Sequence, residues 1–251
     1  MRIPADWDKP SPGNHRLCEK FEYGSFENRG KLLYRLFRPV SDEKVPLVVY
    51  LHGADAFGND NEMQLEMHDI GTMFVREDWQ EKHPCYVLAP QVKGSGHWAG
   101  PSSGDRVCAL IAELLANYPD IDADRVYIYG YSAGGIGALK IIKDHPGVFS
   151  AAIPICAATD NEDMDALLST PMWLFHAADD GIVRVSYGNE GLFASTLGSR
   201  DLYDKLKDKA AEIRYTEYPE GYMKEHYGIN PHCTWVPVSE NLEAAEWLFR
   251  H

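Results

Sequence analysis

A serine at the corner between a strand and a helix is the residue of this sequence best placed for chemistry. Residues 126–137 read VYIYGYSAGGIG, in which a β-branched and aromatic run stops at Gly130 and a small-residue run resumes at Ala133. The spacing G-x-S-x-G around Ser132 is typical of a sharp turn that exposes the hydroxyl, with glycines where a side chain would collide with neighbouring elements. Such a turn directs the backbone N–H of Ala133 at a developing oxyanion. The pentapeptide is also compatible with an ordinary glycine-rich turn, so the rest of the chain must distinguish the two.

A serine hydroxyl needs two partners before it can attack a carbonyl group at neutral pH. One is a general base within hydrogen-bond reach, and the other is a group that orients the base. At a turn of this kind the partners follow in the chain order serine, acid, histidine. Acids follow two later strands, and the long loop 219–238 contains two histidines. The candidates are Asp179 and Asp180 after one strand, Asp160 after the strand before it, and His226 and His232 in the loop.

Strands and helices that could position these residues alternate along the chain. Two alternating segments, 20–26 and 31–38, predict an antiparallel hairpin. Apolar runs predict strands at 47–51, 86–90, 124–129, 151–155, 172–175 and 212–218, and helices are expected at 63–76, 105–118, 133–144, 199–209 and 240–250. We therefore predict an α/β fold in one domain over residues 1–251, with a doubly wound, mostly parallel sheet and ligands beyond the carboxyl ends of its strands. Residues 1–16 are expected to form an extended, proline-containing arm.

Composition excludes several classes of partner. The net charge of −14 disfavours nucleic acids and anionic membranes. The sequence has neither an apolar leader nor a run long enough to cross a membrane, which predicts a cytoplasmic protein. Its five cysteines are scattered without a C-x-x-C pair, and the acidic run 160–165 lacks the glycine and the closing glutamate of a calcium loop. We expect no metal and no cofactor, and the oligomeric state stays open.

The order of the motifs resembles the α/β-hydrolase superfamily. Within it, the chain is similar to serine esterases of the feruloyl and acetyl xylan esterase type and to the dienelactone hydrolase and prolyl oligopeptidase-like group. The segments that carry the resemblance are LHGADAFGNDNEMQL at 51–65, APQ at 89–91 with Trp98, YIYGYSAGG at 127–135, WLFHAADDGIV at 173–183 and HCTW at 232–235. Together they run from about Val45 to the end of the chain, in the order expected for the superfamily.

The resemblance assigns a catalytic triad. Ser132 matches the nucleophile. The acid of related sequences stands four residues after a strand-terminal histidine, which implies Asp180 rather than Asp179. The late histidine followed by a tryptophan-containing turn implies His232, so that His226 is expected at the surface or in a lid.

The resemblance also describes the oxyanion loop. His52 is expected to shape this loop, and the backbone N–H of Ala54 is expected to be the second oxyanion donor beside that of Ala133. Two positions depart from related sequences. Asp55 stands where another glycine is common, and its negative charge would disfavour an oxyanion unless the carboxylate points away. Arg184 replaces a common proline and is expected to be a solvated rim residue or a cation that recognises a substrate carboxylate.

Aromatic residues stand on predicted loops at the carboxyl ends of the strands. Trp98, Tyr131, Tyr227 and Trp235 are candidates for contact with a planar or sugar-like substrate, although a lid that packs on itself would use the same residues.

From these features we expect a serine carboxylic-ester hydrolase that acts through an acyl-enzyme. The resemblance implies small acyl esters, or hydroxycinnamoyl and acetyl esters of carbohydrates, as substrates. A prolyl oligopeptidase-like peptidase shares the triad, but that type normally has a large additional domain, which the residues before the first core strand are too few to form. A protein that retains the fold and binds without turnover is the third possibility.

Overall fold

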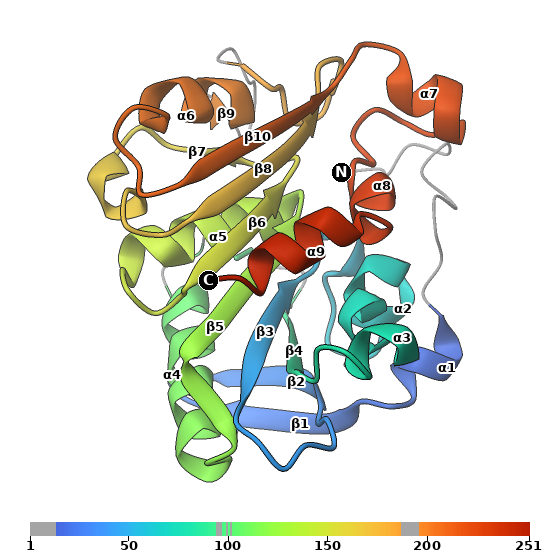
Figure 1. Ribbon diagram of the computed structural model, residues 1–251, viewed down its shortest axis with the longest axis vertical. Helices are drawn as coiled ribbons and strands as arrows, with labels where there is room; N and C mark the ends of the chain where they lie inside the picture. Colours follow the sequence, from blue (N-terminus) through green and yellow to red (C-terminus); the bar gives the residue numbers. More distant parts are fainter. Residues whose placement is uncertain (1–13, 94–96, 99, 101, 187–195) are drawn as a thin grey trace.

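The apolar runs of the sequence form one eight-stranded sheet in the computed structural model, which describes residues 14–93, 97, 98, 100, 102–186 and 196–251. Its strand order is β1-β2-β4-β3-β5-β6-β8-β10 (Figure 1). Neighbours from β4 to β10 are parallel, whereas β1 and β2 form the expected antiparallel hairpin at one edge. The bounds are β1 (Glu22–Glu27), β2 (Lys31–Phe37), β3 (Val45–Leu51), β4 (Tyr86–Gln91), β5 (Ile121–Tyr131), β6 (Ala151–Ile155), β8 (Met172–Ala177) and β10 (Ile213–Tyr218). The predicted fold class is confirmed.

The central strands are apolar because both faces of the sheet are covered. Every residue of β3, β4, β6 and β8 is buried. Along β3, Val48 and Tyr50 belong to the core on one face, while Leu47, Val49 and Leu51 belong to the core on the other. This explains why the strands read as continuous hydrophobic runs rather than as alternating ones.

Helices cover the two faces of the sheet in two groups (Figure 1). Apolar side chains of α4 (Ser103–Asn117), α5 (Ala133–Asp144) and α6 (Ser199–Leu206) pack into one core. Those of α3 (Glu77–Gln80) and α9 (Leu242–Leu248) pack into the other. The helix that follows β5 is therefore anchored directly on the sheet, together with the turn that precedes it.

The predicted helix 63–76 is wrong. The chain there forms a short helix, α2 (Met63–Glu66), followed by a 3-10 segment, η3 (Asp69–Val75). Between them His68 is extended, with φ −144° and ψ 143°. A continuous helix would point the His68 imidazole elsewhere, whereas the extended backbone lets it hydrogen-bond to Asp55.

Further short elements lie outside the predicted strands and helices. The loop 219–238 contains α7 (Tyr222–Tyr227) and α8 (Trp235–Ser239). The last two residues of the predicted arm, 15 and 16, belong to α1 (His15–Cys18), and residues 1–13 lie outside the described residues. The acidic segment after β6 forms the 3-10 turn η4 (Met164–Leu167), and β7 (Ala158–Thr159) pairs with β9 (Leu197–Gly198).

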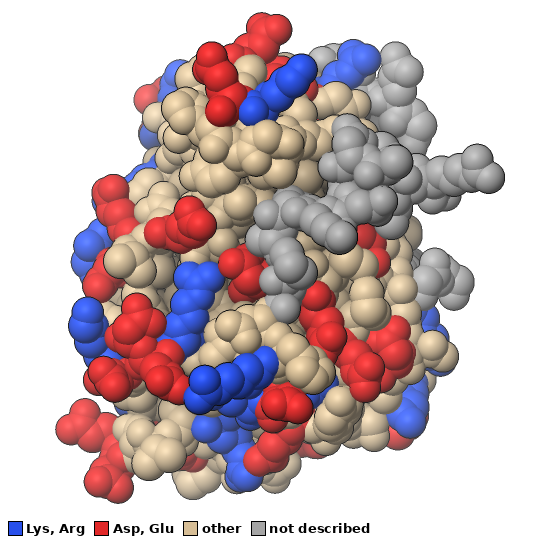
Figure 2. All heavy atoms as spheres, turned by 90° about the vertical axis from the view of Figure 1, so that its right-hand side faces the viewer, with Lys and Arg blue, Asp and Glu red and all other residues tan. Residues whose placement is uncertain are grey.

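The surface carries charges of both signs. On the face shown in Figure 2, Asp and Glu side chains are interspersed with Lys and Arg. Within the described ranges, no helix combines the length and the apolar character that a membrane crossing requires.

Candidate active site

Ser132 stands at the corner between β5 and α5, in a backbone conformation that few residues other than glycine adopt. Its φ is 53° and its ψ is −121°, and its N–H donates to the Ile155 carbonyl at 2.9 Å. Such a conformation costs on the order of 1–3 kcal/mol and persists only where the surroundings enforce it. A Cβ on Gly134 would lie 1.9 Å from the Leu51 carbonyl oxygen, so only glycine lets α5 begin this close to β3. The expected strained turn, with an obligatory glycine beside it, is present.

The structure brings Ser132, His232 and Asp180 together from three distant parts of the sequence. The Ser132 hydroxyl lies 2.9 Å from Nε2 of His232 and can donate to it. On the other side of the ring, the His232 Nδ1–H donates to Asp180 Oδ2 at 2.7 Å. The side chains of His232 and Asp180 are fully buried. This arrangement lets the imidazole accept a proton from the serine while the carboxylate fixes its tautomer.

Four donors surround the Asp180 carboxylate. Oδ1 accepts the N–H groups of Ile182 at 2.8 Å and Val183 at 3.1 Å, whereas Oδ2 accepts Nε2–H of His176 at 3.1 Å besides the bond from His232. Burial alone would raise the pKa of Asp180, but the two histidines outweigh it and hold that pKa well below its usual range. His176 is the strand-terminal histidine that indicated the position of the acid in the sequence. Its hydrogen bond to Asp180 was not predicted.

The other candidates for the acid and the base are engaged elsewhere. Asp179 accepts the N–H of Gly221 at 2.9 Å, at the start of α7. Asp160 pairs with Lys143 on α5. His226 is exposed, and its ring lies 4.2 Å from that of Tyr222. Of the alternatives that the sequence left open, His232 bonds directly to Ser132, and Asp180 bonds to His232.

The loop after β3 is shaped by a buried histidine. The Nδ1–H of His52 donates to the Gly53 carbonyl at 2.7 Å, and its Nε2 accepts the N–H of Val92 at 3.1 Å. Together the two bonds require the neutral ring, and burial lowers the pKa of His52 to about 4. The loop continues as the 3-10 turn η2 (Ala54–Ala56). Among the described residues, the N–H groups of Ala54 and Ala133 make no hydrogen bond with another residue, which keeps both available for an oxyanion.

Three of the four aromatic residues predicted to contact substrate lie in the interior. Trp98, Tyr131 and Trp235 are each about 1% exposed, so their rings offer no surface to a ligand and that prediction is corrected. Trp98 Nε1–H donates to the His52 carbonyl at 2.8 Å, and the rings of Tyr131 and Trp235 pack at 4.4 Å. These rings support the walls of the site from inside. Tyr227, on α7, is half-buried and remains a candidate.

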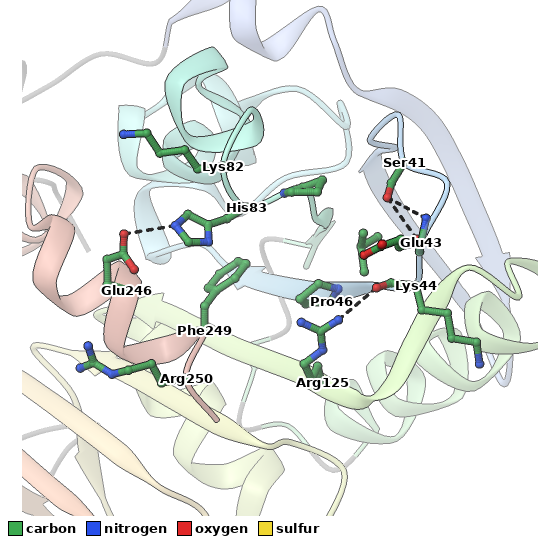
Figure 3. A pocket seen from close by; sticks show the side chains of 12 residues that line it. Ser41, Glu43, Lys44, Pro46, Lys82, His83, Arg125, Glu246, Phe249 and Arg250 are labelled. Carbon is green, nitrogen blue, oxygen red and sulfur yellow. Dashed lines mark hydrogen bonds and ion pairs between the residues drawn. The ribbon is translucent and has the colours of Figure 1, made fainter.

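A separate hollow of about 280 Å³ lies at the amino ends of β3 and β4, away from Ser132 (Figure 3). Its ionic side chains do not converge. Figure 3 shows His83 joined to Glu246 and Arg125 joined to the backbone of Lys44, while the Lys82 and Arg250 side chains point outward. Among the described residues, no group of three or more His, Cys, Asp or Glu side chains is arranged to hold a metal ion.

The chain is similar to a family model and to solved structures. A family described as the prolyl oligopeptidase family matches residues 91–184. The chain is similar to the crystal structure of a thermostable esterase, with 36% identity and a TM-score of 0.85 over 93% of this chain and 63% of that one. It therefore spans somewhat less than two thirds of that esterase. No match was found among curated proteins.

More distant structures share the fold. An acylaminoacyl peptidase of Pyrococcus horikoshii is 17% identical, with a TM-score of 0.59 over 89% of this chain and 41% of that one. A 2,6-dihydroxy-pseudo-oxynicotine hydrolase is 14% identical, with a TM-score of 0.63 over 91% of this chain and 67% of that one. At such low identities the likeness concerns the fold alone.

Proposed function

We propose that this chain, an α/β-hydrolase of the group that includes serine esterases and prolyl oligopeptidase-like proteins, is a serine hydrolase that cleaves carboxylic esters. One observation carries the proposal. Ser132, His232 and Asp180 form an unbroken chain of hydrogen bonds of 2.9 Å and 2.7 Å. A non-catalytic binding protein would have no need of this buried and aligned arrangement.

The proposed reaction proceeds through an acyl-enzyme. His232 Nε2 takes the hydroxyl proton as Ser132 Oγ attacks the ester carbonyl, and Asp180 stabilises the resulting imidazolium. The N–H groups of Ala54 and Ala133 stabilise the oxyanion. His232 then gives its proton to the departing alcohol, which leaves the acyl group on Ser132. Water, deprotonated by the same imidazole, releases the acid and restores the serine.

The substrate proposal is narrower and rests mainly on resemblance. We expect small acyl esters, or acetyl and hydroxycinnamoyl esters of carbohydrates. The similarity to a thermostable esterase supports an ester over other acyl derivatives such as amides. Tyr227 is the one partly exposed member of the four predicted aromatic contacts, so it is the first residue to vary when substrate preference is studied.

A peptidase is the second candidate. The match of residues 91–184 to the prolyl oligopeptidase family favours it. The same triad cleaves amides, provided that His232 protonates the leaving amine. An ester and an amide that carry the same acyl group separate the two candidates, because an esterase hydrolyses only the ester efficiently.

The test compares wild type with paired variants on p-nitrophenyl esters from acetate to octanoate, on methyl ferulate and on acetylated xylan. It also includes acyl-amino-acid p-nitroanilides and the p-nitrophenyl esters of the same acyl-amino acids. We expect Ser132→Ala and His232→Ala to lower kcat by about 10³–10⁶-fold. Asp180→Asn should lower kcat by about 10⁴-fold, because the amide favours the wrong tautomer of His232. Its matched control, Asp179→Asn, should stay within a few-fold of wild type because Asp179 contacts Gly221 instead.

Three results would contradict the proposal. Retained turnover in Ser132→Ala would remove the serine from the chemistry. An inert wild type that also fails to react with a fluorophosphonate would favour the non-catalytic binding protein. Turnover of the anilides at rates that match the esters would favour the peptidase.

A further inference from the structure

A second carboxylate lies inside the wall of the candidate site. Asp55 directly follows Ala54, and its side chain is only 8% exposed. Its Oδ1 accepts the hydroxyl of Tyr131 at 2.7 Å, and its Oδ2 accepts Nε2–H of His68 at 2.7 Å. Tyr131 directly precedes Ser132. The Asp55 carboxylate therefore links the loop that carries one expected oxyanion donor, Ala54, to the residue that precedes the expected nucleophile.

The protonation of this cluster suits a fixed hydrogen-bonded link. Burial would raise the pKa of Asp55, but the hydrogen bonds from His68 and Tyr131 and the attraction of His68 lower it below its usual range. Burial first, and the charge of Asp55 second, raise the pKa of Tyr131 well above its usual range. Tyr131 is therefore a permanent O–H donor and Asp55 an ionised acceptor. Both carboxylate oxygens accept hydrogen bonds, which fixes the orientation of the Asp55 side chain.

The same side chains pack tightly against the loop of the expected base. The His68 ring lies 5.4 Å from that of Tyr131 and 4.8 Å from that of Trp235, and Tyr131 and Trp235 are 4.4 Å apart. Trp235 in turn meets His232 edge-on at 5.8 Å. A Cβ on Gly53 would lie 2.3 Å from the Tyr131 ring, so the oxyanion loop is shaped to receive that ring.

We propose that Asp55, His68 and Tyr131 form a positioning cluster that fixes the Ala54 N–H relative to Ser132 and the Ala133 N–H. The inference rests on the proposed function and deepens it. None of the three side chains touches the reacting atoms, so their effect passes through the loop 53–56. An oxyanion donor must be held within about 0.5 Å of its productive position, and removal of one such donor costs about 10²–10³ in kcat. A loosened donor should cost somewhat less.

Tyr131→Phe tests the cluster with the smallest possible change, because it removes one hydroxyl and keeps the ring. We expect kcat for p-nitrophenyl acetate to fall about 10–100-fold while KM changes less than about 3-fold. The matched control is Tyr129→Phe. Tyr129 is buried on the same strand and donates its hydroxyl to the Ile70 carbonyl at 2.9 Å, without a hydrogen bond to Asp55. The Tyr129→Phe variant should keep kcat within about 3-fold of wild type, although its Tm should fall about as much as that of Tyr131→Phe.

Two further measurements separate positioning from general loosening. Asp55→Asn keeps an acceptor for Tyr131 and should retain more kcat than Asp55→Ala. An aryl trifluoromethyl ketone reacts with the serine to form a tetrahedral oxyanion. Its affinity for Tyr131→Phe should be lower than its affinity for wild type by about the factor by which kcat/KM falls. If Asp55→Ala does not fold, the Tyr131→Phe and Asp55→Asn variants still decide the question.

The outcomes for the cluster and for the proposed function differ. An active wild type in which Tyr131→Phe matches Tyr129→Phe in kcat and in ketone affinity would overturn the positioning cluster alone. A wild type that hydrolyses no ester, or that is unaffected by Ser132→Ala, would overturn the proposed function and the positioning role with it.

Discussion

At the scale of single residues, the site is organised by buried histidines that differ in their partners. His232 lies between an acid and a hydroxyl, which lets it exchange a proton. His52 lies between a carbonyl acceptor and an N–H donor, which makes it a fixed structural link. His176 shares its Nε2–H between Asp180 and the Val183 carbonyl. The residue type is the same in each case, and the hydrogen-bond partners decide what the ring can do.

The lowered pKa of His52 predicts a pH dependence of stability. An unfolded chain binds a proton at this ring below about pH 6.5, whereas the folded protein does so only below about pH 4. The free energy of unfolding should therefore decrease as the pH falls through this window, by up to about 1.4 kcal/mol per pH unit from this group. His52→Gln keeps an acceptor for Val92 and cannot titrate. Urea unfolding at several pH values should show a flatter profile for the variant, and equal slopes would contradict the assignment.

At the scale of elements, the ends of parallel strands deliver the site. The proposed oxyanion loop follows β3, Ser132 follows β5 and the Asp180 loop follows β8. Since these strands are parallel, their carboxyl ends share one edge of the sheet. The start of α5 is pressed against the end of β3, which places the Ala133 N–H next to the oxyanion loop.

Gly134 is therefore predicted to be sensitive to a single methyl group. In Gly134→Ala the new Cβ would lie 1.9 Å from the Leu51 carbonyl oxygen, so α5 must shift and carry Ser132 with it. We expect the free energy of unfolding to fall by about 1–3 kcal/mol, and kcat/KM to fall at least about 10-fold. Gly181→Ala is the control, because its Cβ would meet no atom within 4 Å. Thermal melts and ester kinetics check both variants, and a Gly134→Ala protein equal to wild type would refute the close contact.

At the scale of the whole molecule, the net charge of −14 should influence which esters reach the site. Negative charge lowers the encounter rate of anionic substrates, and salt screens the effect. Monomethyl succinate should therefore show a kcat/KM lower than that of methyl butyrate, by about 2–10-fold at low ionic strength. The gap should narrow as NaCl rises from about 10 to about 300 mM.

The same experiment tests Arg184, which is exposed on the loop after β8. If Arg184 is a rim residue, Arg184→Gln leaves the ratio of the two esters nearly unchanged. A preference of wild type for the anionic ester that Arg184→Gln abolishes would contradict the charge argument and assign carboxylate recognition to this residue.

The sequence by itself determined the features that depend on neighbouring residues. Apolar runs predicted the strands, and the small-residue run that follows Ser132 predicted α5 at residues 133–144, as observed. The G-x-S-x-G pattern predicted the strained corner. Its glycines are required by close contacts within one βα unit and with the adjacent strand, where a side chain would collide. The order of the motifs predicted the α/β-hydrolase fold, which the sheet and the comparisons confirm.

Only the tertiary structure decided which side chains face inward and which partners they meet. The pattern of residues 63–76 suggested one helix, but the backbone is extended at His68, whose side chain bonds to the distant Asp55. Trp98, Tyr131 and Trp235 were candidates for substrate contact and lie in the interior, since a one-dimensional pattern does not say which way a ring points. Asp179 and Asp180 are neighbours in sequence, yet their side chains meet Gly221 and His232 respectively. Such choices depend on contacts between residues that are distant in sequence, which form only when the whole chain has folded.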